Sequence, residues 1–302
     1  MIEEVIAVGG NRKNTIKIYD EVEKPLGVVL IIHGMQEHSG RYEWFCSKLN
    51  KAGYIAVTSD LRGHGKNMVI SRPGYSDGNI FDEIVTDQKA YIKYLKNKYK
   101  KLPLFVFGHS FGSFVTQRLL TESDADVDKF ILCGTGYAKS PAFFFGNLVA
   151  KITEDCMGRG ADAKLIEKLS FKQYEKKFKN GNWLSRDDRV WKKYHEDVLC
   201  GCTFPACFYS SFFGSARKNY KNLAVVDEST PILVISGTKD PVGEYGKGVN
   251  KLLKVYRHHW LNVYAKLYTG ARHELLNETN KDEVVKDIID FLKADNKKIN
   301  NR

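Results

Sequence analysis

The sequence of 302 residues contains no uninterrupted apolar run of the roughly 18–20 residues that a membrane-spanning helix needs. Its first residues, MIEEVIAVGGNRK, lack the basic segment and apolar run of a secretory signal, so we expect a cytoplasmic protein. It also contains no internal repeat and no low-complexity segment. What is present, 43% apolar and 27% charged residues, is typical of an ordinary globular protein.

Cysteines are few and scattered. Six in a chain of this length do not form the disulfide framework of a small secreted domain, so we expect free thiols. Cys200, Cys202 and Cys207 lie close together, but their spacing is not that of a zinc site and they have no clear fourth ligand. We therefore expect neither a metal nor a cofactor.

The net charge of +11 is not gathered into a basic stripe. The densest basic run, YIKYLKNKYKK (91–101), reads as the solvated face and end of a helix. This distribution argues against nucleic acid as a partner and leaves transient contact with an anionic membrane surface open.

Strand patterns alternate with helix patterns over most of the chain. The helix patterns include 42–53 and 82–99, and GVVLIIHG (27–34) is typical of a strand buried on both faces. This alternation predicts an α/β fold, a mostly parallel sheet with helices on both faces. The predicted strands are 4–8, 15–22, 27–34, 54–60, 103–110, 129–136, 231–238 and 262–270.

The alternation stops between 137 and 225. This region has no comparable strand pattern, has helix-like stretches at 161–180 and 186–199, and is rich in aromatic residues (16 of the 86 in 137–222). Because the strand pattern resumes at 231, we predict a helical cap, 137–225, inserted into a core made of 1–136 and 226–302.

The segment Gly108-His109-Ser110-Phe111-Gly112 matches G-x-S-x-G, a tight strand-to-helix turn that exposes a nucleophilic serine. A buried strand pattern precedes it and a helix pattern follows it, as the motif requires. Ser110 is therefore the candidate nucleophile.

A serine nucleophile needs a base, and the base needs an acid to orient it. On this fold the chain order is serine, acid, histidine. Asp240 follows the strand pattern PILVISGT, and His273 follows the next one, NVYAKLYTG. Because parallel strands end at the same sheet edge, we predict a triad of Ser110, Asp240 and His273. Backbone N–H groups of Phe111 and Met35 are the predicted oxyanion donors. Asp60 and Arg62 are expected to brace their loop.

Several segments of the chain match the sequence pattern of a known family. They are HGMQEHSGRY (33–42), SDLRGHGKN (59–67), PGYSDGN (73–79), GHSFGS (108–113) and SGTKDPV (236–242), with the His273 loop. In these segments the chain resembles an α/β-hydrolase of the monoacylglycerol lipase and lysophospholipase group, which shares its pattern with hydrolases labelled serine aminopeptidases. The resemblance implies a fatty-acid ester or thioester as substrate and an acyl-binding channel formed by cap aromatics within 137–225. The turn at Ser110 departs from the group, with Phe111 and Ser113 where HSMGG is usual, which affects packing but removes no backbone donor.

Together these observations predict a serine hydrolase that cleaves carboxylic esters of monoacylglycerols or lysophospholipids. Small-molecule carboxylesterase, thioesterase, peptidase and acyltransferase activities remain alternatives on the same triad. A different class, a non-catalytic binding protein on a hydrolase scaffold, also remains, since fold does not fix function. Oligomeric state, acyl-chain length and head group are left open by the sequence.

Overall fold

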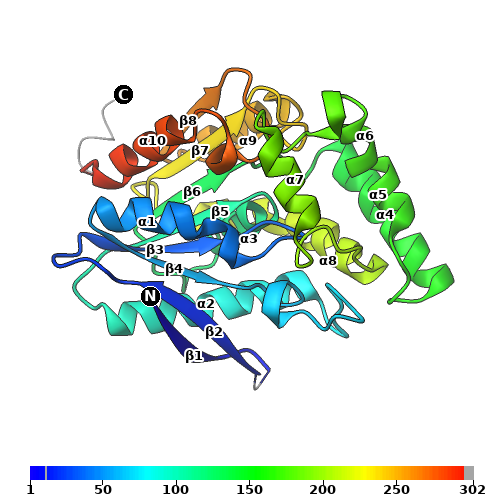
Figure 1. The fold of residues 1–302 in the computed structure, drawn as a ribbon. Coiled ribbons are helices and arrows are strands. Elements are labelled where there is room, and N and C mark those ends of the chain that lie inside the picture. The colour runs from blue at the N-terminus through cyan, green and yellow to red at the C-terminus, as the bar shows by residue number, and fades with distance from the viewer. Residues whose placement is uncertain (11, 296–302) are drawn as a thin grey trace.

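The computed structural model describes residues 1–10 and 12–295. Its centre is a twisted eight-stranded sheet in the order β1-β2-β4-β3-β5-β6-β7-β8 (Figure 1). β1 pairs antiparallel with β2, and β2 pairs antiparallel with β4. The neighbouring strands in the order β4-β3-β5-β6-β7-β8 all pair in parallel. The strands are β1 (Ile2–Val8), β2 (Arg12–Tyr19), β3 (Gly27–Ile32), β4 (Tyr54–Ser59), β5 (Leu104–His109), β6 (Lys129–Cys133), β7 (Ile232–Gly237) and β8 (Val263–Tyr268).

Helices cover both faces of the sheet, as predicted. Side chains of α1 and α10 pack with one face, and those of α2, α3 and α9 pack with the other. β3 to β7 are buried throughout, which is why they read as continuous apolar runs. The core helices are α1 (Glu43–Lys51), α2 (Ile80–Lys98), α3 (Phe111–Leu119), α9 (Lys247–His258) and α10 (Lys281–Lys293).

Between β6 and β7 the chain forms helices and, among its described residues, no strand of the sheet. Figure 1 shows these helices gathered at the right of the molecule, at one end of the strands. α8 packs against α4 and also against α2 and α3 of the core. The helices are α4 (Pro141–Met157), α5 (Lys164–Leu169), α6 (Phe171–Glu175), α7 (Asp188–Glu196) and α8 (Ala206–Ala216).

The helix-like stretch at 161–180 is helical but is not one continuous helix. It is divided into α5 and α6 because Ser170 has non-helical angles (φ −112°, ψ −88°), and its hydroxyl donates to the carbonyl of Ile166 at 2.7 Å. The second expected helix, 186–199, is the shorter α7, whose N-cap is Asp187. The strand expected at 15–22 starts earlier, at Arg12, because the polar residues after the turn pair with β1.

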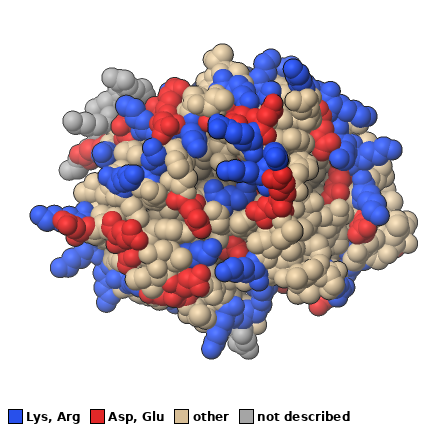
Figure 2. Space-filling model, viewed as in Figure 1, with Lys and Arg blue, Asp and Glu red and all other residues tan. Residues whose placement is uncertain are grey.

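Short 3-10 helices complete the described chain: η1 (Ser39–Tyr42), η2 (Gly65–Asn67), η3 (Lys179–Gly181), η4 (Arg217–Tyr220), η5 (Leu223–Val225) and η6 (Leu275–Asn277). Within the described residues, no helix has the length and apolarity to cross a bilayer. Lys and Arg side chains alternate with Asp and Glu over the face seen in Figure 2, rather than forming one basic stripe.

Candidate active site

The strand order reverses between β3 and β5, which are neighbours in the sheet although β4 separates them in the chain. At such a switch point the loops leaving the two strands diverge and open a crevice at the carboxyl edge of the sheet. The loop after β3 begins at His33, and the turn after β5 carries Ser110. The fold thus places the candidate oxyanion loop beside the candidate nucleophile.

Ser110 stands at the N-cap of α3 with φ 51° and ψ −120°, an unusual backbone conformation for a non-glycine residue. The two flanking glycines make this turn sterically accessible. A Cβ at Gly108 would lie 2.4 Å from the carbonyl oxygen of Gly112, and a Cβ at Gly112 would lie 2.3 Å from the carbonyl oxygen of Ile32. The G-x-S-x-G pattern is therefore a packing requirement of this turn.

His273 and Asp240 lie together at the ends of adjacent strands, β8 and β7. His273 Nδ1 is 3.0 Å from Asp240 Oδ1, and both side chains are buried. Asp240 Oδ1 also accepts from the backbone N–H of Val242 at 2.9 Å, and Oδ2 accepts from the Ser236 hydroxyl at 3.2 Å. These contacts fix the carboxylate and leave Nε2 of His273 as the nitrogen available for proton transfer.

The charge around His273 favours its protonated form. Burial, the largest single influence, works to lower its pKa, but the carboxylates of Asp240, Glu274 and Glu37 together outweigh it, so the pKa of His273 is raised above 6.5. The neighbouring His109, with its ring centroid 4.9 Å away, has no such carboxylate partner. Burial and the proximity of His273 lower the pKa of His109 to about 4. Of these two adjacent rings, His273 is the one whose surroundings favour the protonated form.

Ser110 and His273 line the same cavity, of about 510 Å³. No hydrogen bond joins their side chains in the part of the chain that the structure describes, a common state of a serine–histidine pair without substrate. The predicted oxyanion residues lie at the same place, since Met35 and Phe111 also line the cavity. The β3 loop approaches closely: a Cβ on Gly34 would be 3.2 Å from Ser110 Cβ.

Many of the other residues that line this cavity are aromatic side chains of the inserted region. Trp183 lies against the candidate base, with ring centroids of Trp183 and His273 5.1 Å apart. The cap aromatics expected to line a channel therefore reach the candidate nucleophile. Aromatic lining residues from the inserted region are Phe143, Phe171, Tyr174, Trp183, Tyr194, Tyr209, Phe212 and Phe213.

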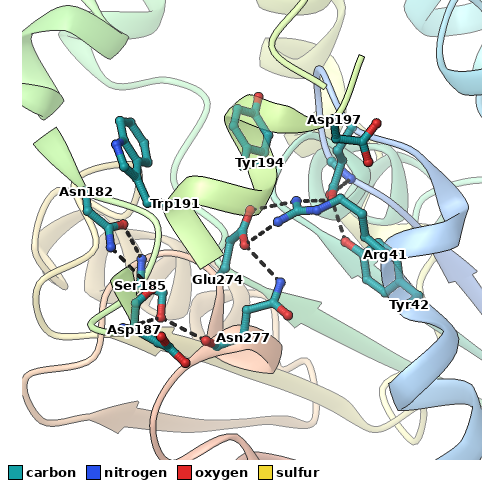
Figure 3. Close-up of polar contacts among 12 residues, drawn as sticks. Arg41, Tyr42, Asn182, Ser185, Asp187, Trp191, Tyr194, Asp197, Glu274 and Asn277 are labelled. Carbon is teal, nitrogen blue, oxygen red and sulfur yellow. Dashed lines mark hydrogen bonds and ion pairs between the residues drawn. The ribbon is translucent and has the colours of Figure 1, made fainter. Parts of the chain in front are cut away.

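A buried ionic network supports the site, and sequence reasoning gave its members no role. Arg41 Nη1 donates to Glu37 at 2.6 Å, and Arg41 binds Glu274 through two hydrogen bonds of 2.8 Å. Figure 3 shows the Glu274 carboxylate between Arg41 and Asn277. Glu37 in turn accepts from the Gly34 N–H at 2.5 Å and from the Tyr42 hydroxyl at 2.8 Å.

This network joins the candidate oxyanion loop to the loop that carries His273, because Glu37 holds the first loop and Glu274 follows His273 directly. Burial alone would raise the pKa of Glu37, but Arg41 and the neighbouring groups lower it to about 2. The only sequence signal was the place of Glu37 and Arg41 inside HGMQEHSGRY; no spacing rule pointed to their partner on a distant loop.

Asp60 and Arg62 brace their loop, as expected. Asp60 accepts from the backbone N–H groups of Ser39 and Lys66, both at 2.8 Å. Arg62 pairs with Asp87 at 2.8 Å and so ties the loop to α2.

One group of side chains has the composition of a metal site: ligand atoms of His38, Asp197 and Cys200 lie within 4.8 Å of one another. His38 Nε2 is already hydrogen-bonded to Asp197 Oδ2 at 2.8 Å. Burial raises the pKa of the Cys200 thiol, which keeps it protonated at neutral pH. The contact between His38 and Asp197 therefore connects the candidate oxyanion loop to the inserted region.

The chain matches the family described as "Serine aminopeptidase, S33" over residues 23–280. It is 24% identical to the monoglyceride lipase homolog of Monkeypox virus over 278 residues, 90% of either chain. It is 27% identical to the monoacylglycerol lipase of Mycolicibacterium smegmatis over 278 residues, 89% of this chain and 88% of the relative.

Among solved structures, a highly thermostable carboxyl esterase from Bacillus coagulans, in complex with glycerol, superposes with a TM-score of 0.84. The two are 28% identical, and the match covers 96% of this chain and 97% of the esterase. This likeness and the sheet topology confirm the predicted α/β-hydrolase fold.

Proposed function

The chain belongs to the serine aminopeptidase S33 family, and from that premise we propose that it is a serine hydrolase that cleaves carboxylic esters. The observation that carries the proposal is the arrangement around one cavity. Ser110 stands on a strained turn, His273 is hydrogen-bonded to the buried Asp240, and both Ser110 and His273 line the same space. The esterase and lipase names of its relatives support the same reaction class.

In the proposed acylation step, Ser110 Oγ attacks the ester carbonyl and its proton passes to Nε2 of His273. Asp240 fixes the ring and stabilises the imidazolium that forms. Charge that develops on the carbonyl oxygen is met by the backbone N–H groups of Phe111 and Met35. Neither N–H has an acceptor among the described residues, so both are available to the oxyanion.

Collapse of the tetrahedral intermediate breaks the bond to the alcohol, which leaves with the proton from His273. Water then attacks the acyl-Ser110 ester, with His273 again acting as base, and the acid is released. A requirement for a metal or cofactor does not arise in this sequence of steps.

The substrate class we propose is a monoacylglycerol or lysophospholipid. The cavity at Ser110 is large, about 510 Å³, and its aromatic walls from α4, α6 and α8 suit a long acyl chain. Helices α4–α8 would act as the cap over this channel. The relatives from Monkeypox virus and Mycolicibacterium smegmatis carry monoglyceride lipase names, which supports this choice over a peptidase or thioesterase.

We also propose transient contact with anionic lipid surfaces. α4 exposes a row of apolar side chains that includes Phe144, Phe145, Leu148 and Ile152. Exposed Lys151 on the same helix adds positive charge near this row. Salt-sensitive binding to anionic vesicles, absent with neutral vesicles, is the expected result; salt-insensitive binding would contradict it.

All six cysteines are free thiols, which supports a reducing compartment such as the cytoplasm.

The test is the initial hydrolysis rate of p-nitrophenyl esters from acetate to palmitate, with Ser110→Ala as the matched variant. A maximum at medium or long chains that is lost in Ser110→Ala supports the proposal. A preference for acetate would refute the lipid substrate and keep the esterase mechanism. Folded protein that neither hydrolyses any ester nor reacts with a fluorophosphonate would indicate the non-catalytic alternative.

A further inference from the structure

A second cavity, of about 300 Å³, adjoins the active-site cavity. The two share a wall, because five residues line both of them. The shared residues are Gln36, Phe171, Trp183, Leu184 and Tyr194. Trp183 is the closest of these to the chemistry, with its ring next to that of His273. Since His273 delivers the proton to the departing alcohol, the second cavity begins where the leaving group separates from the acyl chain.

The walls of this second cavity are unusually aromatic. Trp191 and Tyr194 project from α7 (Figure 3), while Phe171 from α6 stacks on Trp183 with an interplanar angle of 11°. Faces of aromatic rings carry partial negative charge and attract cations, above all quaternary ammonium groups. Tyr194 already makes such a contact on the side of the active-site cavity, where the Arg41 guanidinium lies 5.2 Å from the centre of its ring.

An acid without a counter-charge also lines this cavity. Glu167 forms no ion pair with any described residue, although its carboxylate is partly buried. Its donors are neutral: Gln36 Nε2 at 3.1 Å, the hydroxyls of Thr203 and Tyr209, both at 3.4 Å, and the backbone N–H of Phe204. Burial raises the pKa of Glu167, which a cation placed beside it would oppose. The other carboxylate of the cavity, Glu175, is paired with Lys172.

We propose that this second cavity binds a trimethylammonium group on the leaving alcohol of the substrate, held against the aromatic side chains that line the cavity and balanced by Glu167. The inference rests on the proposed ester hydrolysis and narrows its substrate class to long-chain esters with a cationic head group. A neutral glycerol would supply no counter-charge to Glu167.

A pair of substrates of equal shape tests the charge directly. Decanoylcholine and 3,3-dimethylbutyl decanoate differ in that a quaternary carbon replaces the quaternary nitrogen. We expect kcat/KM to be about tenfold or more higher for the choline ester. Glu167→Gln should lower that ratio at least about threefold, and the aromatic walls account for the preference that remains. The matched control is Asp155→Asn, which makes the same charge change on an exposed part of α4 outside the cavity and should leave the ratio as it is.

A ratio near one in the unaltered protein, or a ratio that Glu167→Gln leaves unchanged, overturns the inference while ester hydrolysis stands. If no ester is cleaved, the proposed function fails, and binding of tetramethylammonium measured by tryptophan fluorescence decides the inference instead. Binding lost in Glu167→Gln supports the cation site; no binding overturns it. Palmitoylcholine and palmitoyl lysophosphatidylcholine, compared at equal concentration, distinguish a simple choline ester from a phospholipid as the source of the group.

Discussion

Replacing Arg41 with methionine is the most informative perturbation of the site. Arg41 is largely buried and holds two acids, Glu37 and Glu274, whose side chains are only 4% and 5% exposed. Methionine fills similar space but leaves both carboxylates buried without a cation. Because Glu37 holds the Gly34 N–H and Glu274 follows His273, the change affects stability and catalysis together.

The size of the effect follows from the network. Removing one partner of a buried ion pair costs about 3–5 kcal/mol. The lowered pKa of Glu37, about 2 against an ordinary 4.5, agrees, since each pKa unit corresponds to about 1.4 kcal/mol. With an unfolding entropy of about 2.1 cal/mol/K per residue, this loss lowers Tm by about 5–8 °C. A loosened Met35 N–H should also lower kcat about 10- to 100-fold.

The assays are thermal unfolding at pH 7 and kcat on the best p-nitrophenyl ester. Arg189→Met is the control, because Arg189 makes the same kind of ion pair, with Asp187, on the surface and should leave Tm and kcat unaltered. Adding Glu274→Gln to Arg41→Met removes one of the unpaired charges and should recover part of the lost stability. A Tm for Arg41→Met within 1 °C of the unaltered protein would refute the network as a support.

Three further predictions concern catalysis and the cavity. Ser110→Ala should lower kcat at least ~10⁴-fold and abolish fluorophosphonate labelling without lowering Tm; retained labelling would identify another nucleophile. Because His273 must be neutral to accept the proton and its pKa is raised, kcat/KM should rise with pH and reach half its maximum above pH 6.5. In Asp240→Asn, burial lowers the pKa of His273 without an opposing Asp240 carboxylate, so the residual kcat/KM should reach half its maximum at a lower pH. An unchanged midpoint would mean that Asp240 does not influence the ionisation of His273. Ala142→Trp should narrow the cavity and reduce palmitate ester hydrolysis at least about tenfold relative to butyrate, while Ala142→Gly keeps the ratio; equal loss on both esters would place the acyl chain elsewhere.

Much of the fold could be read from the sequence because its signals are local. β3 to β7 are buried over their whole length and so appear in the sequence as apolar runs. The turn at Ser110 can be recognised from its two glycines, Gly108 and Gly112. The inserted helices were harder to delimit. Their packing is against one another and against α2 and α3, so no clear periodicity marked α4 or α8, and Ser170 interrupts a segment that has helical composition.

By itself, the sequence determined the sheet architecture, the helical nature of 137–225 and the order of Ser110, Asp240 and His273, because strand burial and turn geometry depend on neighbouring residues. Only the tertiary structure decided which distant charges meet. Arg41 and Glu274 are 233 positions apart, and Glu167 is 131 positions from its partner Gln36. An ion pair or an uncompensated buried acid depends on distance and burial in the folded chain, and neither quantity has a pattern along the sequence.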